Sequence, residues 1–327
     1  ARVKTIREVY FIVHSFREYC DSRYNTVGNG LEAVKCRVAN LRGKSYSMAM
    51  DAFSQVVIVG LGRLGGTLRA ALAARCAVRE IFARALIAGE PTEPIDADAL
   101  VLLTTRDDSI AAAAQALASG GALAASPVVL HCSGALGGDI LSAAAEVGCT
   151  TGSLHPLQTF PTVEAGLDAL ANAPWFFEGD APAQAPAEAL VELLGGRFSI
   201  LPPGSKSLYH AAAVLSCNYM TVLLDAADRL YGACGMPPAD ARAAMAPILE
   251  TTLRNTLARG GAALTGPISR GDATTVQQHL DALAPMPDLE RLYREMGLAC
   301  AALAERNAQI DPPTRQSLDH LLERESQ

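Results

Sequence analysis

The sequence predicts an α/β protein in which a doubly wound, mostly parallel sheet is followed by an all-α C-terminal domain. Two observations carry this prediction. Before residue 203, short runs rich in Val, Ile and Leu alternate with segments of helical periodicity, as in a parallel sheet. After Pro202-Pro203-Gly204, only helical periodicity remains. We therefore expect two domains, residues 51–203 and residues 204–327.

Seven runs are expected to form the strands. The first, "VVIVG", is β-branched and leads directly into a helical pattern. Helices are expected after that run, at about 109–117 and 139–147, and over the segment "PAEALVELLGG". The expected strands are 56–60, 78–84, 99–105, 127–134, 150–155, 174–179 and 197–201.

The C-terminal domain is expected to be built from helices alone. "CGMPPADAR" and "APMPDLE" are proline-marked helix starts. The most apolar stretch, 208–227, contains His210, Asn218 and Asp225, so we expect a buried core helix there and no membrane span. The expected helices are about 205–232, 238–259, 272–284, 287–306 and 312–324.

The first 50 residues differ in composition from the rest. They contain nine Lys or Arg against four Asp or Glu, whereas the remainder contains 18 against 30. Alanine is sparse before Met48 and abundant after it, and no signal-peptide layout is present. We expect residues 1–50 to be a poorly ordered or non-native extension, with Met48 or Met50 as the natural start.

Composition excludes several classes of partner. The net charge of −7 gives no basic surface for nucleic acid. The eight cysteines are scattered without a CxxC pair, which favours reduced thiols and a cytoplasmic protein over disulfides or a zinc site.

Residues 60–65 match the GxGxxG pattern and lie between a predicted strand and a predicted helix, as in a Rossmann domain. The first glycine allows a tight turn, the second lets the backbone approach a pyrophosphate, and the third lets helix and strand pack closely. The helix N-terminus then faces the phosphate charge. We assign to cofactor binding Gly60, Gly62, Arg63, Leu64 and Gly65.

The end of the second strand indicates which cofactor is bound. NAD-preferring sites carry an acidic residue there, about 20 residues beyond the loop. This sequence has Arg84 at that point and Arg63 in the loop, and guanidinium groups suit a 2′-phosphate. Glu80 comes too early on the strand to reach the ribose. We predict NADP, with NAD as the alternative.

The segment "TTRDDSI", residues 104–110, ends the third strand at the carboxyl edge of the sheet, where ligands bind in open α/β folds. Asp107 or Asp108 is expected to cap the following helix. We therefore assign Thr104 and Thr105 of this loop to the cofactor, and not the carboxylates.

Lys206 is the only lysine after residue 50. The preceding prolines and glycine stop a helix from extending backward, so Ser205 is the expected N-cap and Lys206 falls in the first turn. There the helix dipole opposes a cation, at a cost of up to about 1 kcal/mol, and favours the neutral amine.

His210 follows Lys206 at i+4, about 40° around a helix and about 6 Å along it. Hydride transfer to or from a nicotinamide needs a proton donor or acceptor on the substrate heteroatom. Lys206 and His210 are both candidates for this catalytic role, and the alternative for Lys206 is an exposed side chain with its head in water.

The ends of the fourth and fifth strands offer substrate-binding groups. Ser133 and the Gly134 backbone are expected to contact a substrate carboxylate, and His155 faces the same sheet edge. Cys132 reads as a small buried hydrophobe and not as a nucleophile. His131, His155 and His210 lack HxH or HxxxH spacing, so no metal site is predicted.

Two further residues are assigned to substrate binding. Asn218 lies about 18 Å along a straight helix from Lys206, so it reaches the nicotinamide end or is a satisfied core asparagine. Arg270, in a Gly-Pro-Arg loop, either clamps an anionic group or pairs with Asp272 to fix the loop.

Five segments together resemble a known family. "VVIVGLGRLGGTL", "HCSGAL", "GSLHPLQTF", "YHAAAVLSCNYMTVLL" and "ALTGPISRGDATTVQQHL" resemble the bacterial two-domain Rossmann-like proteins whose helical C-terminal domain has no assigned function. That family is similar to pyrroline-5-carboxylate reductases, ketopantoate reductases and β-hydroxyacid dehydrogenases. The resemblance covers about residues 54–310 and implies an NAD(P)-binding oxidoreductase that dimerises through its helical domain.

One departure from the related enzymes affects the substrate. The β-hydroxyacid dehydrogenases use a lysine followed one turn later by an asparagine, and here His210 stands one turn after Lys206. We expect an NADP-dependent oxidoreductase acting on a small polar, carboxylate-bearing substrate. The alternatives are a non-catalytic dinucleotide-binding sensor or scaffold and a reductase of a cyclic imine.

Overall fold

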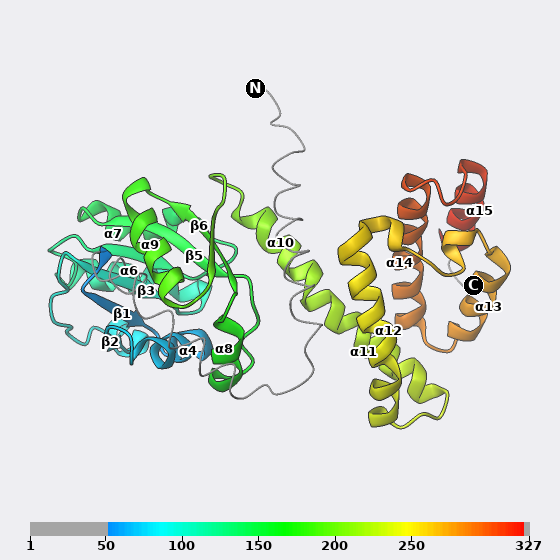
Figure 1. The fold of residues 1–327 in the computed structure, drawn as a ribbon, viewed down its shortest axis with the longest axis horizontal. Helices are drawn as coiled ribbons and strands as arrows, with labels where there is room; N and C mark the ends of the chain where they lie inside the picture. The colour runs from blue at the N-terminus through cyan, green and yellow to red at the C-terminus, as the bar shows by residue number, and fades with distance from the viewer. Residues whose placement is uncertain (1–51, 324–327) are drawn as a thin grey trace. The chain divides into compact units, whose positions relative to one another are not determined.

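The computed structural model of the chain describes residues 52–323, and Figure 1 shows its fold. These residues divide into two compact units, 52–219 and 220–323. The predicted extension of residues 1–50 lies outside the described residues. Helix α10 (Lys206–Ser216) belongs to the first unit, although we expected it to open the second domain. The reason is that its first turn is anchored on the sheet, as described below.

The first unit is built on a seven-stranded sheet in the order β2-β1-β3-β4-β5-β6-β7. All neighbouring pairs are parallel except β5 with β6. The predicted fold class is therefore confirmed. The strands are β1 (Gln55–Val59), β2 (Ala77–Ile81), β3 (Ala99–Leu103), β4 (Val128–His131), β5 (Thr150–Pro156), β6 (Pro174–Gly179) and β7 (Arg197–Ile200).

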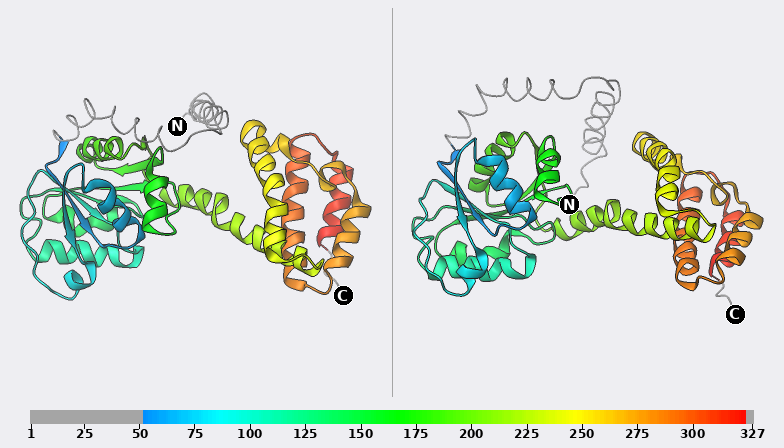
Figure 2. Two further views of the ribbon diagram at one scale, coloured as in Figure 1. Left: turned by 60° about the horizontal axis from the view of Figure 1, so that its bottom comes forward. Right: turned by 90° about the horizontal axis from the view of Figure 1, so that it is seen from below.

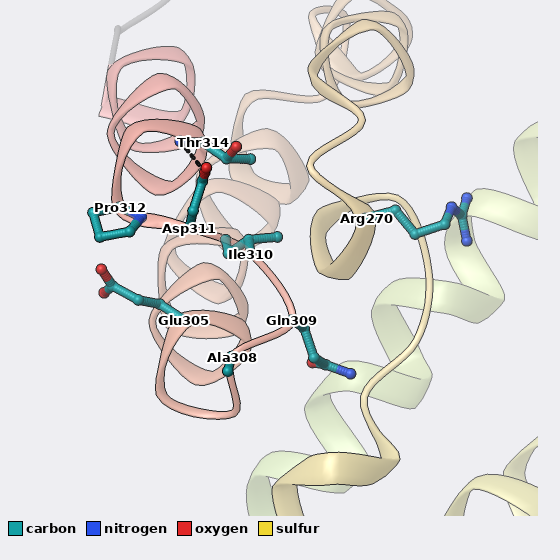
Figure 3. Close-up of a pocket in the computed structure, with 8 residues that line it drawn as sticks. All are labelled: Arg270, Glu305, Ala308, Gln309, Ile310, Asp311, Pro312 and Thr314. Carbon is teal, nitrogen blue, oxygen red and sulfur yellow. Dashed lines mark hydrogen bonds between the residues drawn. The ribbon is translucent and has the colours of Figure 1, made fainter.

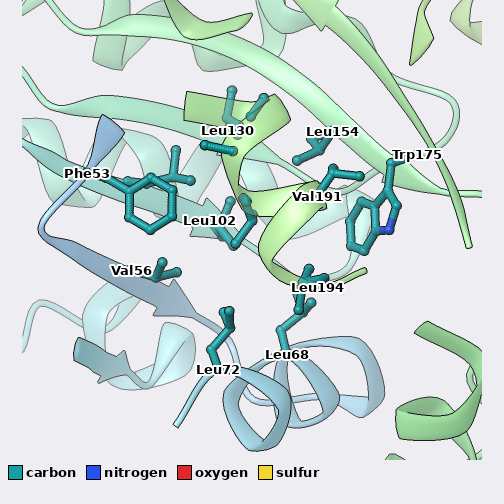
Figure 4. Packing of buried hydrophobic residues seen from close by; sticks show 14 of the residues in the cluster. Phe53, Val56, Leu68, Leu72, Leu102, Leu130, Leu154, Trp175, Val191 and Leu194 are labelled. Carbon is teal, nitrogen blue, oxygen red and sulfur yellow. The ribbon is translucent and has the colours of Figure 1, made fainter. Parts of the chain in front are cut away.

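Helices cover both faces of this sheet, so its central strands are apolar on both sides (Figure 2). Val56 and Ile58 of β1 pack with α4 and α9 in one core cluster, which Figure 4 shows in part. Val57 and Val59 pack on the opposite face with α5, α6 and α7. The helices are α4 (Arg63–Leu72), α5 (Ala83–Ile87), α6 (Asp107–Ser119), α7 (Ser142–Glu146) and α9 (Ala181–Leu193).

Four short helical elements of this unit differ from the prediction. The predicted helix at 139–147 is divided into a 3-10 turn, η1 (Gly138–Leu141), and α7. The five-residue α5 and the eight-residue α8 (Val163–Leu170) were not predicted. Both are shorter than the window of about 11 residues over which helical periodicity can be recognised.

The second unit is helical, as predicted. Its core joins α13, α14 and α15 through residues such as Val276, Ala301 and Leu318. The elements that end in this unit are α11 (Asn218–Ala233), α12 (Pro238–Arg259), η2 (Gly260–Ala263), η3 (Ile268–Arg270), α13 (Ala273–Leu283), α14 (Pro287–Arg306) and α15 (Pro312–Glu323).

The predicted single helix over 205–232 is wrong in two respects. The chain leaves helical geometry at Cys217, which separates α10 from α11. The Ser216 hydroxyl donates to the carbonyls of Ala212 and Ala213, a back-bonding that bends helices. The segment is also not a buried core helix. Lys206–Ala233 is long and apolar enough to cross a membrane, and none of its most apolar window is buried.

Candidate active site

The three glycines of the loop after β1 have three distinct environments. Gly60 has a φ of +98°, which only glycine adopts readily. A Cβ on Gly65 would lie 2.0 Å from the Gly60 carbonyl oxygen, so a side chain there cannot be accommodated. A Cβ on Gly62 would meet nothing within 4 Å. The loop therefore needs Gly60 and Gly65 for its own shape, and Gly62 leaves open space beside the backbone.

Helix α4 begins directly after that open space. Gly62 is its N-cap, no side chain caps it, and its first turn has no acidic residue. Its first backbone N–H groups are therefore free to bind an anion. Leu64 is half-buried and packs against the core, so only its backbone belongs to this loop.

The two threonines after β3 lie beside the glycine loop, because β1 and β3 are neighbours. The Thr104 hydroxyl donates to the Gly60 carbonyl oxygen at 2.5 Å, so its side chain fixes the loop. The Thr105 hydroxyl oxygen is buried and has no partner within residues 52–323. An unpaired buried hydroxyl costs about 1–3 kcal/mol, so Thr105 is better placed than Thr104 to bind a ligand.

The predicted caps of α6 are wrong. The helix begins at Asp107, and Arg106 occupies the N-cap position without a side-chain cap. Asp108 instead accepts from Arg106 at 2.9 Å and from the Ser109 hydroxyl at 2.9 Å. Both carboxylates lie in the first turn, where the helix dipole favours negative charge.

The two arginines assigned to the cofactor are exposed near the carboxyl ends of β1 and β2. Arg63 is the first residue of α4. Arg84 is not at a strand end, because β2 stops at Ile81, and it lies in α5. Neither guanidinium has a hydrogen-bond or ion-pair partner in the described part of the chain. The Glu80 carboxylate is paired with Arg69 at 3.4 Å.

The loop after β4 is fixed by two side chains. His131 is fully buried, its Nε2 bonds the Gly137 carbonyl at 2.9 Å, and its Nδ1 accepts from the Ser133 N–H at 3.1 Å. Burial lowers the pKa of His131 to about 4. The Ser133 hydroxyl accepts from the N–H groups of Ala135 and Leu136. His131 is therefore structural, and Ser133 has only its hydroxyl proton left to donate.

Lys206 is the first residue of α10 and is 2% exposed. Its Nζ donates to the Ser133 carbonyl oxygen at 2.7 Å. Burial, opposed by the carboxylates of Glu178 and Asp107, lowers the pKa of Lys206 to about 8. The alternative of an exposed lysine side chain is therefore excluded. Burial is the largest cause of the lowered pKa, whereas we expected the helix dipole to lower it. The Lys206 ammonium holds two further protons with no acceptor in the described residues.

Ser205 occupies the predicted N-cap position of α10, but its hydroxyl donates to the Pro202 carbonyl at 2.6 Å and makes no side-chain cap bond. Cys132 is buried, and burial raises its pKa to about 12. This thiol is an inert hydrophobe, as expected.

His155 ends β5 beside the start of α10. Its Nδ1 hydrogen-bonds the Tyr209 hydroxyl at 2.8 Å. Burial, with the nearby charge of Lys206, lowers the pKa of His155 to about 3. His155 is therefore a neutral imidazole at physiological pH.

His210 packs edge-on against His155, with ring centroids 5.9 Å apart. A Cβ on Gly134 would lie 2.3 Å from His210 Nδ1 and 3.0 Å from His155 Nε2. Gly134 is therefore required because two imidazoles pack against it. His210 Nδ1 is buried without a partner in the described residues, so this nitrogen, like the Thr105 hydroxyl, is open to a hydrogen bond with a ligand.

The structure thus gathers Ser133, Gly134, His155, Lys206 and His210 within the first unit. In the described part of the chain, Asn218 makes no hydrogen bond to any of these five residues. Asn218 begins α11 and is exposed, so the core-asparagine interpretation is wrong.

Arg270 lies in the helical unit. It is exposed and lines an open pocket of about 630 Å³ together with Glu305 and Asp311 (Figure 3). Asp272 caps α13 by accepting from the Thr275 N–H at 3.0 Å. Lys206 does not line this pocket, and within residues 52–323 no group of three or more His, Cys, Asp or Glu could hold a metal ion.

Sequence reasoning missed Tyr209 and Glu178. Tyr209 lies three residues after Lys206, so helical spacing would have placed it on the same face. Its ring centroid is 5.5 Å from Lys206 Nζ. Glu178 of β6 has no sequence signal, because its proximity to Lys206 depends on the antiparallel pairing of β6 with β5.

One family model matches part of the chain. Residues 173–300 match the family model of a domain of unknown function, DUF2520. No curated protein is significantly similar in sequence. The predicted resemblance to Rossmann-like proteins with a helical domain of unknown function is confirmed by this match together with the structural neighbours.

Two solved structures share the fold. Protein TM1727 from Thermotoga maritima is 20% identical, with a TM-score of 0.59, and the match covers 77% of this chain and 99% of that one. BF3122 from Bacteroides fragilis, provisionally named an NADP oxidoreductase, is 21% identical, with a TM-score of 0.61 and the same coverage. The NADP-bound pyrroline carboxylate reductase of Plasmodium falciparum is 8% identical, with a TM-score of 0.47, over 82% of this chain and 98% of that one. We draw nothing from the third likeness.

Proposed function

We propose that the chain is an NADP-dependent oxidoreductase that transfers hydride to or from a small polar, carboxylate-bearing substrate. The observation that carries the proposal is Lys206, a buried lysine whose pKa is lowered to about 8, next to the loops that follow the parallel strands. A buried cation with uncommitted protons is costly for a structure that does not use it.

The residues present fit a dinucleotide. The open space at Gly62 and the uncapped N-terminus of α4 suit a pyrophosphate. The unpaired Thr105 hydroxyl supplies a further polar contact. Arg63 and Arg84, both exposed and unpartnered in the described residues, suit the 2′-phosphate of NADP. The provisional name of BF3122 agrees with this choice. When bound, the nicotinamide would supply or accept the hydride.

Lys206 would donate the proton in reduction and accept it in oxidation. Near neutral pH its ammonium is mostly charged, so Nζ can protonate a substrate oxygen or nitrogen and become a neutral amine in the reductive direction. The Ser133 carbonyl accepts a hydrogen bond from Nζ in both states, which holds the donor in place. Because the pKa of Lys206 is lowered to about 8, we give the proton to Lys206 and assign His210, whose Nδ1 is unpaired in the described residues, to substrate orientation.

A substrate carboxylate is favoured by the charge of the site. Lys206 provides a positive charge and two uncommitted ammonium protons that donate hydrogen bonds to anionic oxygen. Ser133 adds its one free hydroxyl proton.

The test is a binding and turnover screen. Dissociation constants for NADPH and NADH would be measured on the full chain, followed by NADPH oxidation with a panel of small keto acids, ketones and cyclic imines. We expect NADPH to bind more tightly and a carboxylate-bearing carbonyl to be reduced. Tighter binding of NADH contradicts the cofactor assignment, and binding without turnover on any panel member favours the sensor alternative.

We also propose that the protein is a cytoplasmic homodimer formed through its helical unit. Apolar side chains on α11 and α12 are exposed, among them Val222 (55%), Ile248 (63%) and Leu253 (54%). Exposed apolar patches of this kind mark protein interfaces or membrane contacts. We favour a second copy over a membrane because α11 also contains Asp225, Asp228 and Arg229.

Light scattering after gel filtration tests the dimer. We expect the wild type to be dimeric and Ile248→Glu with Leu253→Glu to be monomeric, whereas Arg254→Glu, an exposed position about 100° or more around α12 from both, stays dimeric. A monomeric wild type, or its co-flotation with phosphatidylcholine vesicles, contradicts this proposal.

A further inference from the structure

We propose that Tyr209 is a positioning residue that holds His155 as the tautomer with its proton on Nε2, so that the substrate atom facing His155 must be a hydrogen-bond acceptor. The tautomer part concerns the protein alone. The substrate part rests on the function proposed above and narrows it to carbonyl and carboxylate oxygen.

Tyr209 is held tightly enough to act in this way. Its hydroxyl lies 2.8 Å from His155 Nδ1, and the two rings are nearly perpendicular, at 82° with centroids 5.6 Å apart. The Phe176 ring also packs against the Tyr209 ring, with centroids 4.8 Å apart. The side chain is therefore fixed between β5, β6 and the start of α10.

The direction of the hydrogen bond follows from the protons present. Burial raises the pKa of the Tyr209 phenol and lowers that of His155 to about 3, so both groups are neutral near pH 7. A neutral imidazole carries one N–H and one lone pair, and the phenol carries one proton. Either the phenol donates to Nδ1, or Nδ1–H donates to the phenol oxygen.

The first arrangement leaves fewer groups unsatisfied. If Nδ1–H donated, the phenolic proton would have no acceptor among residues 52–323, because His155 is the hydroxyl's only partner there. His155 Nε2 also has no partner there, yet it is absent from the buried unpaired atoms, so solvent reaches it and satisfies it in either tautomer. A phenol is also a stronger hydrogen-bond donor than a neutral imidazole N–H, and an imidazole nitrogen is a stronger acceptor than a phenol oxygen, so Tyr209 donates and Nε2 carries the proton.

The consequence concerns the substrate. An Nε2–H group beside Lys206 donates to a carbonyl or carboxylate oxygen and is repelled by a second N–H donor. A protonated cyclic imine presents such a donor. The fixed tautomer therefore favours a keto or hydroxy acid over the cyclic imine.

The experiment measures the tautomer directly, by ¹⁵N NMR of the histidine side chains in the full-length chain at pH 7. His155 is assigned by loss of its signals in His155→Gln. We expect the wild type to show a protonated Nε2 and an unprotonated Nδ1. Tyr209→Phe keeps the ring but removes the hydroxyl, and we expect His155 to become a mixture of tautomers.

The helical unit provides a matched control, because Tyr293 makes the same 2.8 Å contact with His279 Nδ1 at a similar ring angle. Tyr293→Phe should change His279 and leave His155 unaltered. A protonated Nδ1 on wild-type His155 overturns the inference even if Tyr209→Phe fails to fold. Unchanged His155 signals in a folded Tyr209→Phe variant overturn it as well.

The substrate part is tested by titrating glycolate and pyrrolidine, a carboxylate and a cyclic amine, into the same samples. We expect glycolate to shift His155 Nε2 in the wild type and to bind at least about fivefold more weakly to Tyr209→Phe. A shift with pyrrolidine and none with glycolate contradicts the acceptor claim. Failure of every turnover assay would instead contradict the proposed function, and the tautomer result would still stand.

Discussion

The Nζ of Lys206 donates a 2.7 Å hydrogen bond to the carbonyl oxygen of Ser133, and this contact joins α10 to the loop after β4. It ties the only lysine beyond residue 50 to a loop that is itself fixed by His131 and the Ser133 hydroxyl. Burial removes water from the Lys206 ammonium, and this desolvation disfavours its charged form. Four predictions follow from this arrangement and from the loops around it.

Replacing Lys206 by Met should stabilise the protein. Its pKa falls from 10.5 to about 8 because burial penalises the charge, so at pH 7 the folded state carries a penalty of about 1–3 kcal/mol. The Ser133 carbonyl keeps a bond from the Ser153 hydroxyl. Urea unfolding measures the change. The gain should be largest below pH 8 and shrink toward pH 10.5, because the folded wild type loses its proton first in that window.

A destabilised Lys206→Met variant would contradict this prediction, since it would mean that the ammonium contributes net stability. The exposed neighbour Ser207 serves as the control, and Ser207→Ala should leave the free energy of unfolding unchanged within about 0.5 kcal/mol.

Reduction of the substrate should depend on the protonated form of Lys206. With a pKa of about 8, kcat/KM for reduction is expected to be constant below pH 8 and to fall about tenfold per pH unit above it. For substrate oxidation, which needs the neutral amine, kcat/KM should instead rise with pH up to about 8 and be constant above it. A profile for reduction that stays flat up to pH 10 would exclude Lys206 as the proton donor.

Acid should destabilise the first unit through two buried histidines. The pKa values of His131 and His155 are lowered from 6.5 to about 4 and about 3, chiefly by burial. Their stabilisation is complete above pH 6.5 and is lost as the pH falls toward the folded pKa values, because only the unfolded chain binds protons in that window. Each should cost about 2 kcal/mol between pH 7 and pH 5.

The variant His155→Gln separates this effect from general acid unfolding. It should lose about 2 kcal/mol less than the wild type between pH 7 and pH 5, measured by urea unfolding at both pH values. Equal losses in the two proteins would mean that His155 is not a buried neutral imidazole.

Two glycine variants distinguish what the glycine loop after β1 needs for its shape from what it needs to bind NADPH. Gly62→Ala adds a methyl group to open space at a φ of −68°, so the melting temperature should be unchanged while NADPH binding weakens at least about tenfold. Gly65→Ala places a methyl group 2.0 Å from the Gly60 carbonyl and should lower the melting temperature. Undiminished NADPH binding by Gly62→Ala would contradict the assignment of the loop.

Much of the fold was predictable because its signals are local. Strands β1, β3 and β4 are buried on both faces of the sheet, and this burial leaves a nearly continuous hydrophobic pattern in their sequences. Helix α12 matches its predicted range because prolines mark its start and a glycine follows its end.

The errors arose where distant contacts decide local structure. The segment 208–227 resembles a core helix, but within its own chain its apolar residues have too few neighbours to bury them. The role of Tyr209 depends on His155, 54 positions away, and no periodicity reveals that pair.

The central claim is that Lys206 supplies the proton for an NADPH-dependent reduction, and single-turnover oxidation of bound NADPH tests it most directly. The wild type and Lys206→Met would be mixed with the best carboxylate-bearing carbonyl from the panel at pH 7. We predict equal NADPH affinity and a loss of at least about 100-fold in the rate of NADPH oxidation in the variant. Undiminished oxidation by a folded, NADPH-saturated Lys206→Met protein would contradict the account.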